Sequence, residues 1–336
     1  MPQLEGRQQI AIKQEATAGT AETLAAADVV FHSGIATWEP KIEMIPREFM
    51  TASLSPRGSV VGVRSASIKW KMPLSCSYNH TTGAIAAPVA GSTEPQFSVP
   101  LKGCGALLTV SGVGPNEQCA YTPSSTTISD ETTGAYCTVA LYQDGKRYMI
   151  HGAVGNPRLT FATGSPAMVE YEFTGLYNTP TDVALLSGAI YPTTVEPAFL
   201  AASVSLIGSV TTAKLQSLTL DFGNQIGMRP YPNGTTGFFT AQITGRKPTG
   251  TLDPEESLVS VKDWFAEWIL GTAGAITTGV YPAGGTNYNQ FSLTIPNAMY
   301  TKVGLAGRDG IAIAPHDFEC MANTVAGDDE WSLIQT

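Results

Sequence analysis

The sequence is poor in charged residues and contains no long apolar run. Aspartate, glutamate, lysine and arginine make up 14% of its 336 residues, whereas roughly a quarter is usual for a soluble domain. Low charge indicates that much of the surface is covered by assembly with other chains. No stretch approaches the roughly 20 apolar residues that span a bilayer, and the start, MPQLEGRQQIAIKQE, lacks the apolar segment of a signal peptide. We therefore expect folding in a cytosol, without a membrane partner.

Basic residues are also scarce, since 19 of them face 28 acidic residues and give a formal charge of −9. Proteins that hold nucleic acid tightly neutralise its phosphates with many lysines and arginines. This balance excludes tight wrapping of nucleic acid.

Motifs of catalysis and metal binding are missing. The five cysteines form no C-x-x-C pair, and none of the four histidines has another histidine two to four residues away. We expect reduced, mostly buried thiols and no metal site. No G-x-G-x-x-G, P-loop or G-x-S-x-G is present, and Glu170 and Glu172 are more typical of the solvent face of a strand than of an acid pair. The prediction is a protein without catalytic residues, metal or cofactor.

Glycine and proline are abundant, at 34 and 22 residues, which indicates a turn-rich β protein. Residues 136–177 alternate apolar and polar side chains, the period of half-buried strands. We place turns between these strands at Asp144-Gly145, at Asn156-Pro157 and at 164–166.

The first half is predicted to begin with an arm over residues 1–35, followed by a domain over 36–178. Trp38, Ile42 and Met44 lie on one side of an expected strand, and residues 45–64 are expected to form a long loop. Residues 95–108 have apolar side chains at helical spacing, whereas the rest of 76–130 resembles loops. Whether residues 76–130 form a decoration on the outside of the protein is left open.

The second half is predicted to follow a proline-rich linker over residues 179–210 and to occupy 211–336. Its strand at 214–222 precedes a loop over 223–237. A helix over 260–270 is expected to be capped by Ser260, to stop at Gly271 and to bury the aromatic side chains of Trp264, Phe265 and Trp268 against a sheet. Each half thus reads strand, long loop, strand, helix and strands, so the fold is predicted to be duplicated.

Several stretches resemble the tail tube proteins of long, non-contractile-tailed bacteriophages, the siphophages. They are IAIKQEATAGTAETLAAADVV, EYEFTGLYNTPTD, LTLDFGNQIGMR, ITGRKPTGTLDPE and GLAGRDGIAIAPHDFEC. The resemblance implies a mainly β fold with two tandem tail-tube-type β-sandwiches, each flanked by one α-helix. It also implies a homotrimeric ring with pseudo-sixfold symmetry, and stacked rings that form a virion tail tube assembled in the bacterial host cytoplasm. The implied partners are other copies of the chain, the tape measure protein, tail terminator and distal tail proteins, and DNA that passes without sticking.

On this resemblance, rings contact one another through residues 48–64, residues 223–237 and the arm 15–28. The residues expected at the ring-stacking interface are Phe49, Met50, Leu54, Arg57, Met228, Arg229 and Tyr231. The acidic candidates for the lumen are Glu170, Glu172 and Asp221.

Three alternatives remain open. In the first, the chain is another virion component, such as a tail terminator, a baseplate ring or a capsid decoration protein. In the second, it is a carbohydrate-binding or adhesive β-sandwich pair with Trp38, Trp70 and Trp331 as sugar platforms. In the third, it is a hydrolase whose site is assembled from distant residues.

Overall fold

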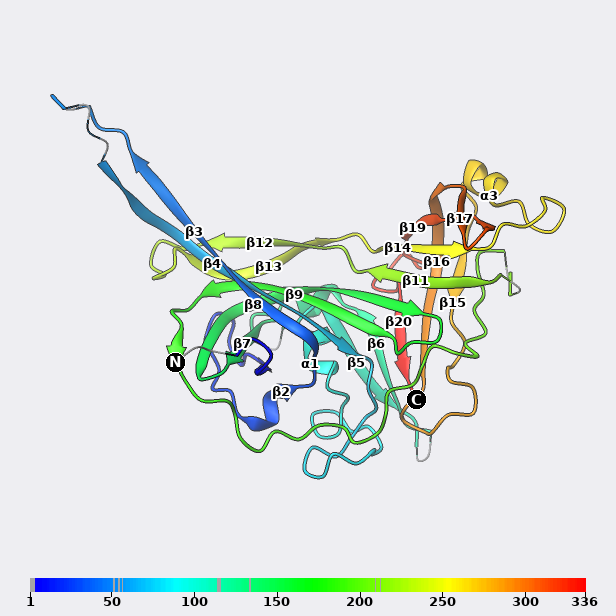
Figure 1. Cartoon of the computed structure of the whole chain (residues 1–336), viewed down its shortest axis with the longest axis horizontal. Helices are drawn as coiled ribbons and strands as arrows, with labels where there is room; N and C mark the ends of the chain where they lie inside the picture. The colour runs from blue at the N-terminus through cyan, green and yellow to red at the C-terminus, as the bar shows by residue number, and fades with distance from the viewer. Residues whose placement is uncertain are drawn as a thin grey trace.

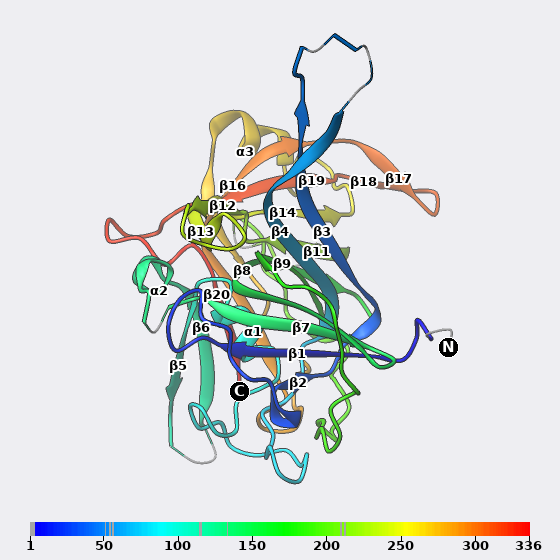
Figure 2. The ribbon, with the colours of Figure 1, turned by 90° about the vertical axis from the view of Figure 1, so that its left-hand side faces the viewer.

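The structure is a computed structural model that describes residues 4–50, 52–53, 55, 57–113, 116–132, 134–208, 210–211 and 213–336. The chain is mainly β, as predicted, and most of its described strands join one 16-stranded sheet. The sheet curls into the body of the molecule, from which one long hairpin projects (Figure 1). Figure 2, seen from the side, shows the same hairpin rising above the body.

The helices and strands follow one another in two series along the chain. The first series is β1 (Gln8–Gln14), η1 (Ala26–Asp28), β2 (Val29–Val30), β3 (Ser33–Arg47), β4 (Arg57–Pro73), α1 (Ser98–Lys102), β5 (Ala106–Ser111), β6 (Gln118–Pro123), α2 (Ser125–Ser129), β7 (Cys137–Gln143), β8 (Lys146–Ala162), β9 (Met168–Tyr177) and β10 (Thr181–Asp182). The second series is β11 (Leu215–Asp221), β12 (Asn224–Pro230), β13 (Phe238–Arg246), β14 (Thr249–Pro254), α3 (Trp264–Leu270), β15 (Ala273–Thr277), β16 (Phe291–Val303), β17 (Ala306–Arg308), β18 (Ile311–Ile313), β19 (His316–Cys320) and β20 (Ser332–Gln335).

Strands β7, β8 and β9 form the antiparallel meander that the alternation predicts. Asp144 and Gly145 both have positive φ, as the first turn requires. The turn predicted at Asn156-Pro157 is wrong, because β8 runs through both residues. Pro157 is tolerated there because its carbonyl accepts from the Phe222 N–H at 3.2 Å, a contact that does not need the missing proline N–H.

The long loop predicted over residues 45–64 is mostly strand. Strands β3 and β4 pair as far as Ile45 opposite Val60 and Arg47 opposite Arg57, with register shifts along the way. Ile42 and Met44, expected on a strand face of the domain, are exposed because this part of β3 has left the body. The loop predicted over 223–237 is strand from Asn224 to Pro230, where β12 pairs with β13, and residues 231–237 form the turn between them.

The segment before the meander belongs to the body of the protein. The helix expected over 95–108 is limited to the five residues of α1, because β5 starts three residues after the Gly103 cap. Strands β5 and β6 form a hairpin, and β6 pairs with β20 near the end of the chain. The segment 76–130 therefore contributes strands to the main sheet and buries Tyr121 in the core.

Helix α3 is shorter than predicted and is capped differently. It begins at Trp264, and the Asp263 side chain, rather than that of Ser260, accepts from the Ala266 N–H at 2.9 Å. Gly271 ends it in the left-handed conformation, as expected. Trp264 is buried, but Phe265 and Trp268 are exposed. Their predicted burial is wrong because only one side of this short helix reaches the sheet.

Two groups of four strands are paired in the same order. One runs β3, β4, β9, β8 and the other runs β11, β14, β19, β16, and in each group the first two strands belong to a long hairpin. The groups are joined because β11 pairs with β8. A single buried cluster then spans both parts of the chain, for example where Phe97 lies 6.1 Å from Phe291 and Phe222 lies 4.0 Å from Trp331, measured between ring centroids. All five cysteines are free and buried in it or near it.

Candidate assembly surfaces

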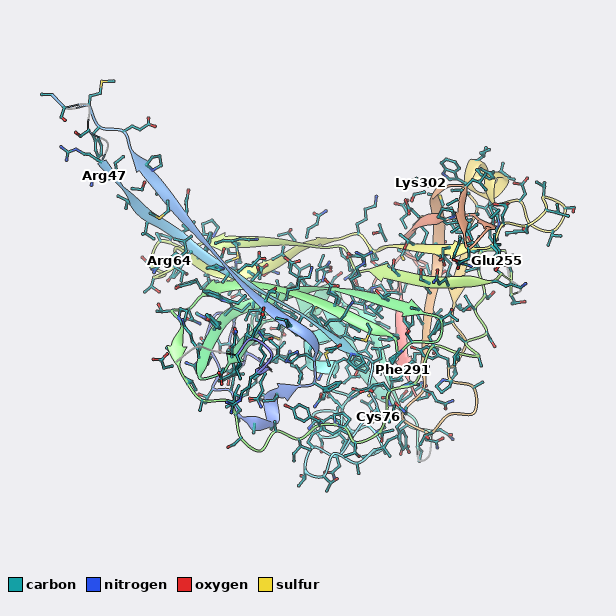
Figure 3. All side chains as sticks on the ribbon, viewed as in Figure 1. Arg47, Arg64, Cys76, Glu255, Phe291 and Lys302 are labelled. Atoms are coloured by element: carbon teal, nitrogen blue, oxygen red, sulfur yellow. The ribbon has the colours of Figure 1, made fainter. Side chains whose placement is uncertain are left out.

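The tip of the β3–β4 hairpin is an exposed apolar surface far from the body. Figure 3 labels Arg64 where the hairpin leaves the body and Arg47 near its far end. Phe49 and Met50, two of the expected stacking residues, are exposed at this tip, with the Arg47 guanidinium 5.3 Å above the Phe49 ring. Arg57 is exposed as well, whereas Leu54 lies outside the described residues.

Sequence reasoning missed the apolar residues along the hairpin itself. Large side chains on both faces of its two strands are exposed: Ile42, Met44, Ile45, Val60 and Val61. Adjacent apolar residues such as Val60 and Val61 could have indicated this surface. Neighbouring residues of a strand point to opposite faces, so two apolar neighbours make both faces apolar. Apolar side chains on both faces of a projecting ribbon indicate contact with another molecule on each face.

The three stacking residues expected in the second half lie on the β12–β13 hairpin and have different surroundings. Met228 packs against a small apolar cluster. The Arg229 guanidinium pairs with the Glu131 carboxylate at 2.5 Å and lies 5.0 Å from the Phe239 ring. Tyr231 is exposed and packs edge-on against Phe239. The structure places this hairpin at the base of the β3–β4 hairpin rather than at its tip (Figure 1), so the two predicted groups do not form one surface.

The three acidic lumen candidates lie on one polar face of the main sheet. Asp221 pairs with Arg158 in the next strand, and Arg158 pairs with Glu170. Paired residues project to the same face, and so do residues two apart such as Glu170 and Glu172. A hydrogen bond from the Lys69 ammonium, 2.7 Å from the Glu170 carboxylate, lowers the pKa of Glu170. The face is therefore of mixed charge rather than purely acidic.

A second apolar surface surrounds α3. Besides Phe265 and Trp268, several neighbouring side chains are strongly exposed: Leu258, Val259, Val261, Ile269 and Leu270. Trp264 is the one buried residue of this helix. The indole Nε1 of Trp268 donates to the Thr301 carbonyl at 3.0 Å. A helix with apolar residues on all sides is the sequence signal for this surface.

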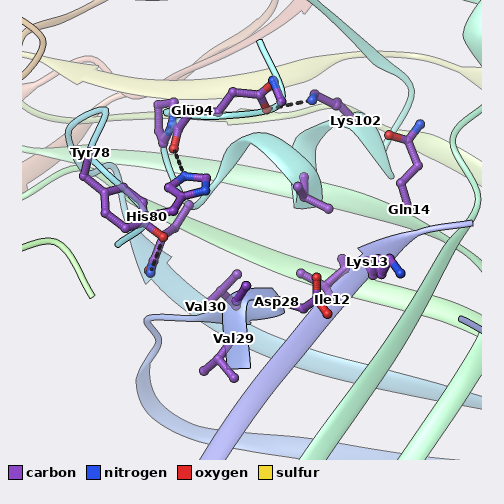
Figure 4. Close-up of a pocket in the computed structure, with 15 residues that line it drawn as sticks. Ile12, Lys13, Gln14, Asp28, Val29, Val30, Tyr78, His80, Glu94 and Lys102 are labelled. Atoms are coloured by element: carbon purple, nitrogen blue, oxygen red, sulfur yellow. Dashed lines mark hydrogen bonds and ion pairs between the residues drawn. The ribbon is translucent and has the colours of Figure 1, made fainter. Parts of the chain in front are cut away.

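A cleft of about 330 Å³ lies between β1, β2 and the segment leading into α1 (Figure 4). Inside it the Lys102 ammonium is 2.6 Å from the Glu94 carboxylate, which also accepts from the Ser98 hydroxyl. Burial disfavours the charged carboxylate, but hydrogen bonds from Lys102, Ser98 and the Gly91 N–H outweigh it and lower the pKa of Glu94. His80 Nε2 lies 3.1 Å from the Glu94 carbonyl. These partners fasten the segment to α1.

The tryptophans proposed as sugar platforms do not form one. Trp70 and Trp331 are buried, and Trp38 packs against Tyr148 with ring centroids 4.8 Å apart. Sugar-binding aromatic side chains must present a face to solvent, so this prediction is wrong.

Two features that would point to other functions are absent from the described residues. No group of three or more His, Cys, Asp or Glu side chains there has the arrangement of a metal site. No helix in the same ranges has the length and apolar character needed to cross a membrane.

Comparison with known proteins gives one match that covers almost the whole chain. The family model described as phage tail tube protein matches residues 6–322. A search of curated proteins gave no match.

Proposed function

Because the chain belongs to the phage tail tube protein family, we propose that this structural virion protein forms rings that stack into the hollow tube of a siphophage tail. The β3–β4 hairpin is the observation that carries this proposal. Its exposed apolar side chains have no covering partner among the described residues and extend away from the body, where a neighbouring ring would cover them. A copy that remained single would leave this surface in water.

The proposed ring is a homotrimer with pseudo-sixfold symmetry. The matching strand orders β3, β4, β9, β8 and β11, β14, β19, β16 support two equivalent domains per chain, at 36–178 and 211–336. The proline-rich segment 179–210 connects them, although it is well packed where Phe199, Leu206 and Ile207 are buried. Three chains then present six similar units around a ring that closes by rotation.

The polar face that carries Glu170, Glu172 and Asp221 is proposed to line the lumen. Lysine and arginine side chains lie beside these acids, so few positive charges remain available to hold phosphate. DNA released through the tail then passes without sticking. The tape measure protein would occupy the same lumen, and the tail terminator and distal tail proteins would contact the ends of the tube.

Deleting residues 48–60 tests the role of the hairpin. We expect the deletion variant to remain folded, with unchanged thermal unfolding, and to give rings or single chains but no tubes in negative-stain images. Unaltered tubes would show that the hairpin does not hold rings together. If the wild-type protein gave isolated single rings at every concentration, the alternative role as a tail terminator or baseplate ring would be favoured instead.

A further inference from the structure

Strand β11 meets β8 at a seam within the chain. The two strands are antiparallel, with Leu220 opposite Leu159 and Asp221 opposite Arg158. At the end of this seam the Asn156 side-chain amide donates to the Asp221 carboxylate at 2.8 Å. Strand β8 carries β9 on one edge, whereas its other edge is shared by β7 and then β11. This seam shows how one group of four strands adds to the next.

The registers of the two groups match along three rows, apart from a register shift in β16 that leaves Thr301 out of the ladder. Three rows of paired residues across the first group are Thr37, Lys69, Glu172, Asn156; Trp38, Ile68, Phe173, Gly155; and Glu39, Ser67, Thr174, Val154. The corresponding rows across the second group are Thr219, Thr251, Asp317, Lys302; Leu220, Gly250, Phe318, Tyr300; and Asp221, Thr249, Glu319, Met299. Phe173 falls on Phe318 and Glu172 on Asp317, which supports the alignment. Glu39 then corresponds to Asp221, and Lys302 corresponds to Asn156.

The two groups leave one open strand edge at each end. Within the described residues β3 pairs with β4 alone. Strand β16 pairs with β19 on one edge, and on the other edge its pairing with β15 ends at Met299. Beyond that point the chain reaches residues 304–306, which correspond to residues 158–160 of β8, where β11 covers that strand. The strand order therefore runs from an open β3 to an open end of β16.

We propose that β3 of one copy pairs antiparallel with residues 304–306 of the next copy, in the register of the β8–β11 seam. The proposal rests on the ring proposed above and specifies the partner and register of its closing contact. Trp38 lies opposite Leu305, Thr37 opposite Ala306 and Glu39 opposite Gly304. Each added copy repeats the strand order that the chain already contains.

Backbone directions agree with this pairing. The Gly304 N–H donates to the Pro315 carbonyl at 2.9 Å, so the backbone groups of Val303 and Leu305 point to the opposite, open edge. The Gln8 amide bonds both backbone groups of Ala36, and the Trp268 indole bonds the Thr301 carbonyl. These side chains bound the seam at its two ends.

Two side chains in the proposed seam lack the partners that their counterparts have. Leu159 in the seam within the chain is 1% exposed, whereas the corresponding Leu305 is 72% exposed and would be covered opposite Trp38. Lys302 stands at the position of Asn156 and Glu39 at the position of Asp221. In place of the Asn156–Asp221 hydrogen bond, the proposed seam therefore has two side chains of opposite charge. Lys302 has a 71% exposed side chain and reaches Asp317 only at 4.0 Å, so it is placed to pair with Glu39 of the neighbour.

Disulfide cross-linking of the full chain tests the register. Thr37 and Ala306 are exposed, and in this register they form a non-hydrogen-bonded pair with Cα atoms about 4.5 Å apart, within disulfide reach. We expect the Thr37→Cys/Ala306→Cys variant to form closed covalent rings on oxidation. Each single variant should give none, because the native cysteines are buried. The control Thr37→Cys/Gly304→Cys, two residues out of register, should also remain uncross-linked.

Charge reversal provides the second arm of the test. Glu39→Lys and Lys302→Glu should each raise the concentration needed for ring formation about tenfold, and the double variant should restore it to within about twofold. Cross-linking only in the out-of-register control, or rings indifferent to both reversals, would overturn the seam while tubes of wild-type protein still upheld the proposed function. A wild-type chain that formed no rings or tubes would overturn the proposed function itself.

Discussion

The backbone N–H of Arg64 donates to the carbonyl oxygen of Thr236 across 2.9 Å. This bond joins the base of the β3–β4 hairpin to the turn of the β12–β13 hairpin, and the Arg64 guanidinium reaches the Thr235 carbonyl beside it. Gly237 follows in this turn with φ +81° and packs closely against Val63. The base of the long hairpin is therefore held by contacts with the second half of the chain.

Replacing Gly237 by alanine should disturb this junction. Its Cβ would lie 2.6 Å from Val63 Cγ1 in a backbone conformation that already disfavours side chains, and we expect a loss of about 2 kcal/mol or more in unfolding free energy. Gly164→Ala is the matched control, because Gly164 has φ +82° but open space around its Cβ, and should cost only about 1 kcal/mol. Denaturant unfolding measures both, and equal losses would contradict the importance of the Val63 contact.

A charge at the hairpin tip should prevent tube formation without affecting the fold. Met50 and Val325 are both fully exposed apolar residues, but only Met50 lies in the proposed stacking surface. Met50→Glu should abolish tubes in negative-stain images, since a charge would be buried between rings, whereas Val325→Glu should leave them intact. Both variants should unfold within about 0.5 kcal/mol of the wild type. Tubes of normal length from Met50→Glu would argue against stacking through this tip.

Helix α3 should depend on one of its two tryptophans for stability. Trp264 is buried and packs against the rings of His316 and Tyr300, so Trp264→Ala should cost about 3–5 kcal/mol of unfolding free energy. Trp268 is 38% exposed, and Trp268→Ala should cost about 1 kcal/mol, mainly through its bond to the Thr301 carbonyl. The comparison is made by urea unfolding, and equal costs would contradict the burial pattern of the helix.

Acid should weaken the fold through His316. This side chain is buried, and burial is the main cause that lowers its pKa to about 4, with Lys262 adding to the effect and the Ala314 carbonyl and Asp317 opposing it. Below the unfolded-state pKa of about 6.5 the unfolded chain gains a proton that the folded chain does not bind. The unfolding free energy should therefore fall between about pH 6.5 and pH 4, by up to about 3 kcal/mol.

His316→Phe checks the origin of this pH dependence. Phenylalanine retains an aromatic ring against Trp264 and Tyr300, whose centroids lie 4.8 and 4.6 Å from the histidine ring, but cannot take up a proton. Unfolding curves at several pH values should show a smaller decrease between pH 6.5 and pH 4 for this variant. The same decrease in both proteins would assign the effect to other groups.

Several individual strands, turns and helix ends could be predicted from local residue patterns. Alternation located β7 and β9, Asp144-Gly145 located a turn, and Gly271 located the end of α3. Each of these depends on neighbouring residues alone, through the strand period or a left-handed backbone conformation. The strand through Asn156-Pro157 was missed because the proline is tolerated only where the β8–β11 ladder ends, at Arg158 opposite Asp221, and this depends on a distant strand.

The candidate surfaces depended more strongly on contacts between distant residues. Prolines and glycines in residues 45–64 indicated a functional segment, but not that it is a projecting ribbon, because pairing of β3 with β4 cannot be read from either strand separately. The helical spacing of Trp264, Phe265 and Trp268 likewise did not reveal which side meets the sheet.

The sequence by itself determined that this is a β-rich chain of low charge, with turns such as Asp144-Gly145 and with its family resemblance, since these follow from composition and short-range pattern. Only the tertiary structure decided which strand edges are paired and which are open, because hydrogen bonding between strands joins residues such as Asp221 and Arg158 that are distant in the chain. It also decided that the apolar residues of the long hairpin lie in solvent rather than in the core.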